Sequence, residues 1–268
     1  MRTYDNDILL SPTATDEGSG MGRTAVVTGG ASGMGLAICR HLAARGHRIA
    51  VLDLDHEAAE RAAEDLRGNG AQAVASVVDV SDRATVDDAL AKVRSEFGPV
   101  EIMVTSAGVA AFTKFTDITI EAWNRIIAVN LTGTFHCLQA VIPEMLSARW
   151  GRIVTISSSS AQSGAPRMGH YVASKGGVIA LTKALAREYA RFGITVNTIP
   201  PSSIETPMAE QARAAGNLPS ADDLAARIPV GRVGTGDDIA AACSFLCSEE
   251  AGYITGQIIG VNGGAVIS

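Results

Sequence analysis

The sequence predicts a single α/β domain built on a doubly wound parallel sheet of about seven strands, with helices on both faces. Short apolar runs without clean polar alternation recur along the chain, as parallel strands covered on both faces require. Amphipathic stretches of helical periodicity separate these runs, and such alternation is typical of right-handed β-α-β units. With 268 residues, 47% of them hydrophobic, the chain is long enough to bury a sizeable core.

The expected elements alternate from residue 24 to the C-terminus. The strands are expected at 24–30, 48–54, 73–80, 100–108, 152–158, 194–199 and 257–263. The helices between them are expected at 34–45, 56–68, 82–97, 121–147, 170–192 and 237–248. In such a sheet, ligands bind beyond the carboxyl ends of the strands.

One segment, 200–235, interrupts the alternation. It is rich in Pro, Gly and Ala, and it follows the end of an expected strand. We predict a substrate lid here, with a purely structural excursion as the alternative.

The first residues differ in composition from the rest of the chain. Residues 1–21 lack a basic segment followed by a long apolar one, so they do not resemble a signal peptide. We predict a mobile N-terminal tail over 1–21 and one dinucleotide-binding and catalytic domain over 22–268.

Charge and hydropathy exclude several partners. The net charge is −6 and no basic run stands out, which argues against a nucleic acid or an anionic membrane as partner. No stretch reaches 18 continuous apolar residues, so no transmembrane helix is expected. We therefore predict a cytoplasmic protein.

The four cysteines give no pattern for a metal or a disulfide framework. Cys243 and Cys247 lie four residues apart in an expected helix, with no histidine nearby, and Cys39 and Cys137 are isolated. Buried thiols in a reducing cytosol, and no bound metal, are the prediction.

A glycine-rich stretch, VVTGGASGMGLAIC, follows the first expected strand and opens a helix. It places Gly29, Gly33 and Gly35 at the strand-to-helix turn. Glycines there let the backbone turn tightly and approach a pyrophosphate, which the helix N-terminus stabilises. The position of the stretch predicts a dinucleotide site.

The second expected strand ends in VLDLD, eighteen residues beyond Gly35. Asp53 is placed to accept hydrogen bonds from the adenosine ribose hydroxyls, which selects NAD(H) over NADP(H). A basic residue would favour a 2′-phosphate, but Ser32 and Leu54 occupy the neighbouring positions. The alternative is that Asp53 caps the next helix.

Asp79 and Val80 end the third expected strand. The sequence leaves open whether Asp79 contacts a cofactor or is the N-terminal cap of the helix at 82–97.

A tyrosine and a lysine, four residues apart in YVASK, would share one face of a helix. Tyrosine, with a pKa near 10, is a weak base at neutral pH. We expect the Lys175 ammonium and an oxidised nicotinamide to lower the pKa of Tyr171 toward the working range. Thirteen residues earlier lies Ser158, within the run TISSSS.

Taken together, these motifs resemble the short-chain dehydrogenase/reductase family from about residue 23 to the C-terminus. The matching positions, in order, are Thr28, Gly29, Gly33, Gly35, Asp53, Asp79, Ala107, Gly108, Asn130, Ser158, Tyr171, Lys175 and the stretch NTIPPSSIETPM. The resemblance implies a Rossmann fold, a nicotinamide cofactor, a small-molecule alcohol or ketone substrate, and a homotetramer.

The resemblance also implies roles for individual residues. Tyr171 would be the general base in alcohol oxidation or the general acid in ketone reduction, and Ser158 would bind the substrate oxygen. Lys175 would bind the nicotinamide ribose, and Asn130 would extend a proton relay through its backbone and a water. The implied cofactor contacts are Gly29, Ser32, Gly33, Met34, Gly35, Asp53, Leu54, Asp79, Val80, Ala107, Gly108, Tyr171, Lys175, Ile204 and Thr206.

Two stretches depart from the family pattern. Thr105 and Ser106 stand where the family commonly has two asparagines, and Ser202 stands where it commonly has glycine. We expect altered hydrogen bonding at the first site and altered nicotinamide packing or substrate access at the second.

The substrate pocket is expected to draw on 109–115, 159–170 and the 200–235 lid. Arg167 and His170 would bind a polar handle or lie in a solvated loop. A medium-sized, largely apolar secondary alcohol is the first expectation, and a 3-oxoacyl thioester of acyl carrier protein or coenzyme A is the alternative.

The residue set argues against two other classes of protein, a dinucleotide sensor and a serine hydrolase. A dinucleotide sensor without turnover has no need to keep Asn130, Ser158, Tyr171 and Lys175 together. A serine hydrolase would need a Gly-x-Ser-x-Gly elbow, which the chain lacks. An NAD-dependent dehydrogenase or reductase acting on CH–OH groups is therefore the prediction.

Overall fold

The protein folds around one sheet of six parallel strands in the order β3-β2-β1-β4-β5-β6. The computed structural model describes residues 22–267, so the tail predicted over 1–21 lies outside the described residues. The strands are β1 (Thr24–Thr28), β2 (Arg48–Asp53), β3 (Ala73–Val77), β4 (Ile102–Thr105), β5 (Gly151–Ile156) and β6 (Ile194–Ile199). The order reverses between β1 and β4, which opens a ligand crevice at their carboxyl ends.

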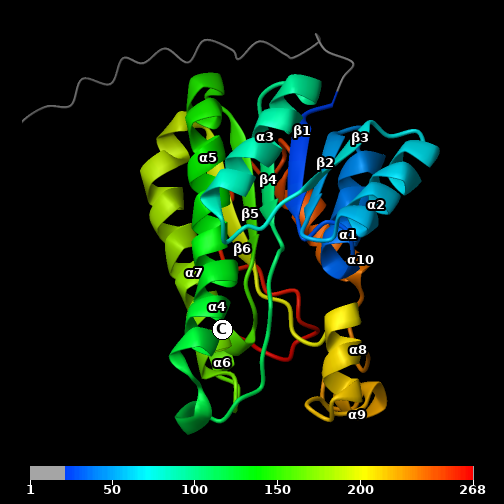
Figure 1. Ribbon diagram of the computed structural model, residues 1–268, viewed down its shortest axis with the longest axis vertical. Helices are drawn as coiled ribbons and strands as arrows, with labels where there is room; N and C mark the ends of the chain where they lie inside the picture. The colour runs from blue at the N-terminus through cyan, green and yellow to red at the C-terminus, as the bar shows by residue number, and fades with distance from the viewer. Residues whose placement is uncertain (1–21, 268) are drawn as a thin grey trace, which may run out of the picture.

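Helices cover both faces of the sheet (Figure 1). The helices are α1 (Gly33–Ala44), α2 (His56–Gly68), α3 (Arg83–Phe97), α4 (Ile120–Ile127), α5 (Gly133–Ala148), α6 (Ser160–Ser163), α7 (Gly169–Tyr189), α8 (Pro207–Ala214), α9 (Ala221–Ala225) and α10 (Gly236–Leu246). Three pack on one face, α1, α2 and α10, while α3, α5 and α7 pack on the other. The predicted doubly wound fold is confirmed.

The strand sequences are continuously apolar because each strand supplies two cores. In β1, Ala25 and Val27 pack in the core with α1, α2 and α10, while Val26 packs in the core with α3 and α5. All three side chains are fully buried. Both faces of β1 are covered by helices, so a polar side chain at any of these positions would be buried away from water. Polar and apolar residues therefore do not alternate along the strand.

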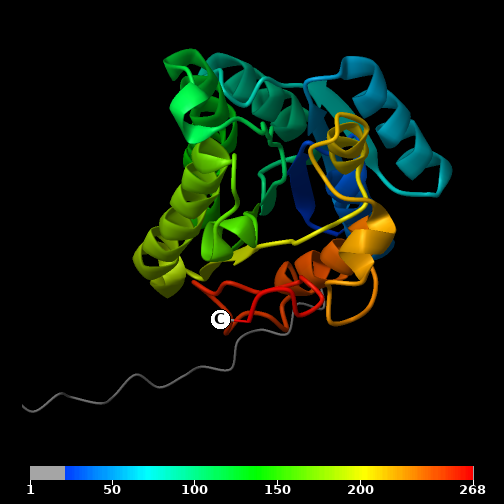
Figure 2. The same cartoon turned by 90° about the horizontal axis from the view of Figure 1, so that it is seen from below.

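Five strands end one to three residues earlier than the apolar runs suggested. The residues beyond β1, β2, β3 and β4 leave the sheet and form loops that line one cleft at this edge, and those beyond β5 line a second one. Figure 2 looks onto that edge, where α8 and α9 lie across from α6.

The prediction of a seventh strand at 257–263 is wrong. Only a single-residue bridge joins Ile258 to Thr198 of β6. The Asn197 side chain bonds the backbone beside it, donating to the Ile254 carbonyl at 2.7 Å and accepting from the Gln257 amide at 3.1 Å. Backbone bonds join Gly256, Gln257 and Ile259 to β6 as well, but side chains supply the other contacts, so no regular ladder continues.

The helix predicted over 121–147 is interrupted. A π-helical turn, Ala128–Thr132, separates α4 from α5. The whole run, Ile120–Ala148, is long and apolar enough to cross a bilayer. Its buried residues, including Cys137, Leu138 and Val141, pack in the core beneath the sheet, which accounts for the apolar sequence.

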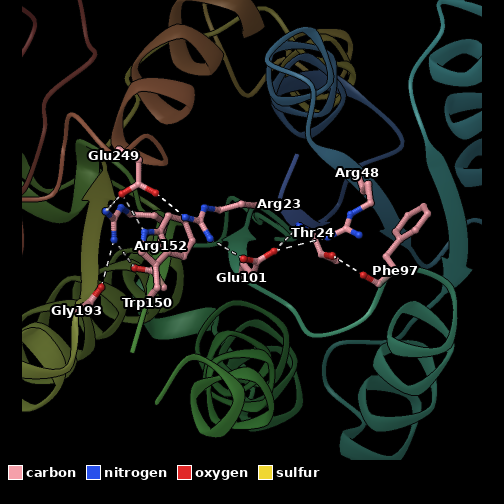
Figure 3. Close-up of polar contacts among 10 residues, drawn as sticks. Arg23, Thr24, Arg48, Phe97, Glu101, Trp150, Arg152, Gly193 and Glu249 are labelled. Atoms are coloured by element: carbon pink, nitrogen blue, oxygen red, sulfur yellow. Dashed lines mark hydrogen bonds and ion pairs between the residues drawn. The ribbon is translucent and has the colours of Figure 1, made fainter. Parts of the chain in front are cut away.

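At the amino ends of the strands, opposite the crevice, a polar cluster ties distant segments together (Figure 3). The Trp150 ring lies between two guanidinium groups, with Arg23 at 3.6 Å and Arg152 at 4.4 Å from its centroid. Glu249 forms an ion pair with both arginines and accepts a hydrogen bond from the Trp150 indole at 3.0 Å. Arg152 is only 4% exposed, so its charge depends on these partners.

Replacing Glu249 with alanine should therefore lower stability by about 1–2 kcal/mol, since it leaves the buried Arg152 charge without a carboxylate, in contact with backbone carbonyls and the Trp150 ring. Thermal melting should drop by about 2–8 °C. The neighbouring Glu250→Ala, which removes an exposed carboxylate, is the matched control and should shift melting by less than about 2 °C. Equal shifts in the two variants would contradict this assignment.

Candidate active site

The glycine-rich turn meets the requirements of a phosphate site. A Cβ on Gly35 would lie 2.0 Å from the Gly29 carbonyl oxygen, so only glycine permits this crossing of the backbone. Gly29 itself has φ +65°, a left-handed conformation that favours glycine. Ser32 at the N-cap of α1 makes no side-chain cap in the described structure, so the amides of the first turn remain available to an anion.

A cleft of about 430 Å³ opens in front of this turn. Its lining includes twelve of the predicted cofactor contacts: Gly29, Ser32, Gly33, Met34, Gly35, Asp53, Leu54, Asp79, Val80, Ala107, Gly108 and Thr206. It also includes residues that were not among the predicted cofactor contacts: Val78, Ser81, Ser106, Val109, Arg125, Ala128, Val129, Pro207 and Met208. The contribution of Arg125 from α4 to this wall follows no local motif and comes only from the tertiary packing.

Asp53 lies at the edge of this cleft and does not cap a helix. Its carboxylate accepts hydrogen bonds from the backbone amides of Ala31 at 3.1 Å and Asp55 at 3.2 Å. The N-cap of α2 is Asp55, whose side chain accepts from Ala58. The carboxylate of Asp53 is thus fixed beside the glycine turn, and the helix-cap alternative does not hold.

Asp79 likewise does not cap the helix that follows it. The cap of α3 is Asp82, which accepts from the Ala84 amide at 2.9 Å. Asp79 instead accepts from the Ser81 amide and hydroxyl, at 2.9 and 2.6 Å, and lines the cleft with Val80.

Ser158, Tyr171 and Lys175 come together where β5 ends. Ser158 follows β5, and its hydroxyl is hydrogen-bonded to Tyr171 of α7. Lys175, one turn further along α7, has its Nζ 5.9 Å from the centroid of the Tyr171 ring. The same Nζ donates to the Ile156 carbonyl at 2.8 Å, which anchors α7 to the end of β5.

Burial sets the proton affinities of this pair. It raises the pKa of Tyr171 above the ordinary value, and the hydrogen bond from Ser158 offsets part of that rise. It lowers the pKa of Lys175 to about 8. The protein by itself therefore moves the pKa of Tyr171 in the direction opposite to our expectation, because desolvation disfavours the phenolate.

Asn130 lies in the π-helical turn and is fully buried. Its side chain exchanges two hydrogen bonds with the Val109 backbone, at 2.8 and 3.0 Å, and donates to the Ser174 hydroxyl at 3.0 Å. A Cβ on Gly108 would approach Asn130 Oδ1 at 3.3 Å and Lys175 Nζ at 3.4 Å. Asn130 and Lys175 thus lie directly behind the part of the cleft formed by Gly108.

The two departures from the family pattern leave the backbone intact. Thr28 holds the loop at Thr105 and Ser106, since its carbonyl accepts from the Ser106 amide at 3.2 Å and its hydroxyl from the Ala107 amide at 3.3 Å. Ser202 has no positive φ, and its hydroxyl donates to the Asn262 carbonyl at 3.0 Å. Ser202 therefore occupies a conformation that needs no glycine.

A second cleft, of about 440 Å³, is lined by Tyr171 and Ser158, neither of which lines the first. All three segments expected to form the substrate pocket contribute to it, through residues such as Phe112, Met168 and Leu218. Ala265 and Val266 near the C-terminus also line it, which the sequence did not indicate. Ile204 lines this cleft rather than the cofactor side, whereas Met34, Thr206 and Met208 line both.

The two candidates for a polar handle differ in exposure. Arg167 is exposed to solvent, as in the solvated-loop alternative, and in the left-handed region at φ +63° it donates to the Phe112 carbonyl and to the Asn217 side chain, both at 3.2 Å. It therefore bridges the two rims of the second cleft. His170 is fully buried, and its ring nitrogens have no hydrogen-bond partner within residues 22–267.

The lowered pKa of Lys175 predicts a specific dependence of stability on pH. Because the folded protein releases this proton near pH 8 and an unfolded chain near 10.5, stability should rise with pH between these values. With no nucleotide added, wild type should gain about 1–2 kcal/mol relative to Lys175→Met between pH 7.5 and 9.5. Urea denaturation at the two pH values measures this, and an unchanged difference would contradict the lowered pKa.

Comparisons with known proteins agree with this geometry. A family profile described as enoyl-(acyl carrier protein) reductase matches residues 29–266. The 3-oxoacyl-[acyl-carrier-protein] reductase of Escherichia coli K12 is 40% identical over 243 residues, which cover 91% of this chain and 97% of that protein. The D-threitol dehydrogenase of Mycolicibacterium smegmatis is 40% identical over 246 residues, covering 92% and 94%.

A solved structure is also similar over nearly the whole length. The crystal structure of a variant of actinorhodin polyketide ketoreductase with NADPH aligns with a TM-score of 0.88 and 34% identity, covering 91% of this chain and 97% of that one. The six-stranded parallel sheet, the glycine turn and these alignments give one conclusion. The chain belongs to the short-chain dehydrogenase/reductase family of oxidoreductases.

Proposed function

We propose that the protein is a nicotinamide-dependent oxidoreductase that interconverts a secondary alcohol and a ketone, with Tyr171 as general acid and base. The observation that carries this proposal is the position of Tyr171, which lines the second cleft and is hydrogen-bonded to Ser158. Lys175, beneath Tyr171, reaches the back of the cofactor cleft at Gly108. A proton-transfer group thus lies where the two clefts meet.

Each side chain has a role that its contacts support. A bound nicotinamide would supply or accept the hydride. Ser158 and Tyr171 bind the substrate oxygen, and Tyr171 Oη gives up or takes the proton on that oxygen. Lys175 places a positive charge below the phenol and binds the nicotinamide ribose. Asn130 keeps the Gly108–Val109 backbone against that ribose, through its two bonds to Val109.

The protein without cofactor holds Tyr171 in the form that ketone reduction uses. Burial raises the pKa of the phenol, so it stays protonated at neutral pH, as a general acid must be. Oxidation requires the phenolate, and its formation then depends on the added charge of the oxidised cofactor.

Tyr171→Phe tests the chemistry. It removes the proton-transfer oxygen and keeps the ring, so turnover should fall by at least about 100-fold, within the range of a lost general acid. The measurement is the rate of NADH consumption or formation at 340 nm with any substrate found. Cofactor affinity, measured by fluorescence titration, should change little, and retained turnover would refute the mechanism.

Two substrate classes have support. A 3-oxoacyl thioester fits the activity named for the Escherichia coli relative, and the apolar side chains of Phe112, Met168 and Leu218 suit an acyl chain. A polyol fits the threitol dehydrogenase relative, and seven serines line the same cleft: Ser157, Ser158, Ser159, Ser160, Ser163, Ser202 and Ser203. The thioester has the wider support among relatives and is the first candidate.

A panel with both classes separates them. Acetoacetyl thioesters with NADH should show the higher kcat/KM if the first candidate is right, and C4 to C6 polyols with NAD should do so if the second is right. Activity on simple cyclic alcohols alone would overturn both.

We also propose that NAD(H) is preferred over NADP(H). Asp53 is held at the cleft edge by two backbone amides and cannot swing away without losing both. At ~4 Å and an effective dielectric constant of about 20, its repulsion of a 2′-phosphate is about 4 kcal/mol before screening. Arg125, which lines the cleft, comes from α4 and not from the loop after β2. The ketoreductase relative was crystallised with NADPH, so the preference proposed here rests on Asp53 alone.

Asp53→Ser should raise the kcat/KM ratio of NADP(H) to NAD(H) by about 10-fold or more, because the repulsive charge is gone. The control is Asp79→Asn, which removes a charge from the same cleft away from the glycine turn and should leave that ratio within about twofold. A ratio unchanged by Asp53→Ser would refute the proposed role.

The lid over 200–235, the homotetramer and the cytoplasmic location remain predictions. Light scattering of the purified protein tests the tetramer.

A further inference from the structure

Ser158 has a hydroxyl neighbour that the catalytic scheme does not use. The Ser160 hydroxyl lies 2.8 Å from the Ser158 hydroxyl, and the Ser160 amide also donates to Ser158 Oγ at 3.3 Å. Ser160 begins the short helix α6 and lines the second cleft.

The loop that carries both serines is held by its backbone. The Ser157 amide donates to the Ile199 carbonyl and the Ser159 amide to the Pro201 carbonyl, both at 2.9 Å. The turn closes with a bond from the Gly164 amide to the Ser160 carbonyl, also at 2.9 Å. With the backbone fixed on both sides, two rotations remain at Ser158, one about its Cα–Cβ bond, which the contacts from Ser160 restrict, and one of its O–H bond.

The number of hydrogen bonds that a hydroxyl can donate and accept then limits where the Ser158 proton points. A serine hydroxyl has one proton to donate and two lone pairs to accept with. The Ser160 hydroxyl contacts the Ser158 hydroxyl, and either oxygen could be the donor. If Ser160 donates to Ser158, its hydroxyl and amide together fill both lone pairs of Ser158. The proton of Ser158 is then left for Tyr171 or for a substrate oxygen.

In the opposite arrangement, Ser158 donates its proton to Ser160. That proton would then be unavailable to the substrate oxygen, and the Ser160 proton would be left to solvent in the cleft. The first arrangement keeps the Ser160 proton in a hydrogen bond within the protein and directs the Ser158 proton toward Tyr171, so it is the arrangement that suits the reaction.

We propose that Ser160 is a positioning residue that fixes Ser158 as a hydrogen-bond donor toward Tyr171 and the substrate oxygen. The inference rests on the proposed function for its catalytic meaning, because it assigns a role to the partner of Ser158 in that reaction. The hydrogen-bonded chain from Ser160 through Ser158 to Tyr171 also strengthens the Ser158 donor, since successive hydrogen bonds polarise one another.

The test compares Ser160→Ala, which deletes the hydroxyl and keeps the amide, with Ser160→Thr, which restores a hydroxyl. Ser160→Ala should lower kcat about 3- to 10-fold, the factor expected for one lost hydrogen bond, and Ser160→Thr should recover most of it. Ser160→Ala should also move the limb of the pH profile for alcohol oxidation that reports on Tyr171 to higher pH.

A double-mutant cycle separates positioning from a direct contact with substrate. If Ser160 acts through Ser158, Ser160→Ala should have almost no further effect on kcat in a Ser158→Ala background. An equal loss in both backgrounds would overturn the proposal, because Ser160 would then act on substrate or on the loop by itself.

A measurement without turnover keeps this proposal distinct from the proposed function. The ultraviolet absorbance of tyrosinate, taken as the difference between wild type and Tyr171→Phe, gives the titration of Tyr171. Ser160→Ala should shift this titration upward, whereas Ser159→Ala, which removes a neighbouring hydroxyl, should leave it in place. A shift without turnover on any substrate would refute the proposed function alone. Turnover that depends on Tyr171, with no shift in Ser160→Ala, would refute the positioning role alone.

Discussion

The active site depends on the docking of α7 against the carboxyl end of β5. Lys175 Nζ donates to the Ile156 carbonyl at 2.8 Å, and the Thr182 hydroxyl bonds the Thr155 hydroxyl at 2.9 Å two turns further along the helix. These two contacts set both the rotation of α7 and its position along the strand. A shift by one residue would turn Tyr171 by about 100° around the helix axis and remove it from Ser158.

This arrangement requires the desolvation of the Lys175 ammonium, which is electrostatically unfavourable. Lys175 is 5% exposed and its described contacts include no carboxylate, so burial lowers its pKa to about 8. An ammonium in such a place destabilises the folded protein and attracts the negative charge that develops on Tyr171 or on a bound ribose. Asn130 closes this region on the other side, since the π-helical turn brings its side chain to both Val109 and Ser174. The site is therefore stabilised by backbone contacts rather than by its own charges.

Much of this arrangement could be predicted from local sequence. The apolar runs gave six of the strands because each strand is buried on both faces, and the glycine turn was found because Gly29 and Gly35 have no substitute at their close approach. Tyr171 and Lys175 were paired because helical spacing places them one turn apart. The seventh strand was wrong for a reason that no local pattern reveals, namely that the Asn197 side chain takes the backbone bonds of the neighbouring segment.

The sequence by itself determined the fold class and the cofactor turn, because these follow from periodicity and spacing within one or two elements, and the family resemblance supplied the proposed proton-transfer residues. Tertiary structure alone decided how residues far apart in the chain meet. It assigned the helix caps to Asp55 and Asp82, which left Asp53 and Asp79 facing the cleft. In the protein without cofactor it also raises the pKa of Tyr171, because desolvation depends on everything packed around the phenol and not on the residues beside it in the chain.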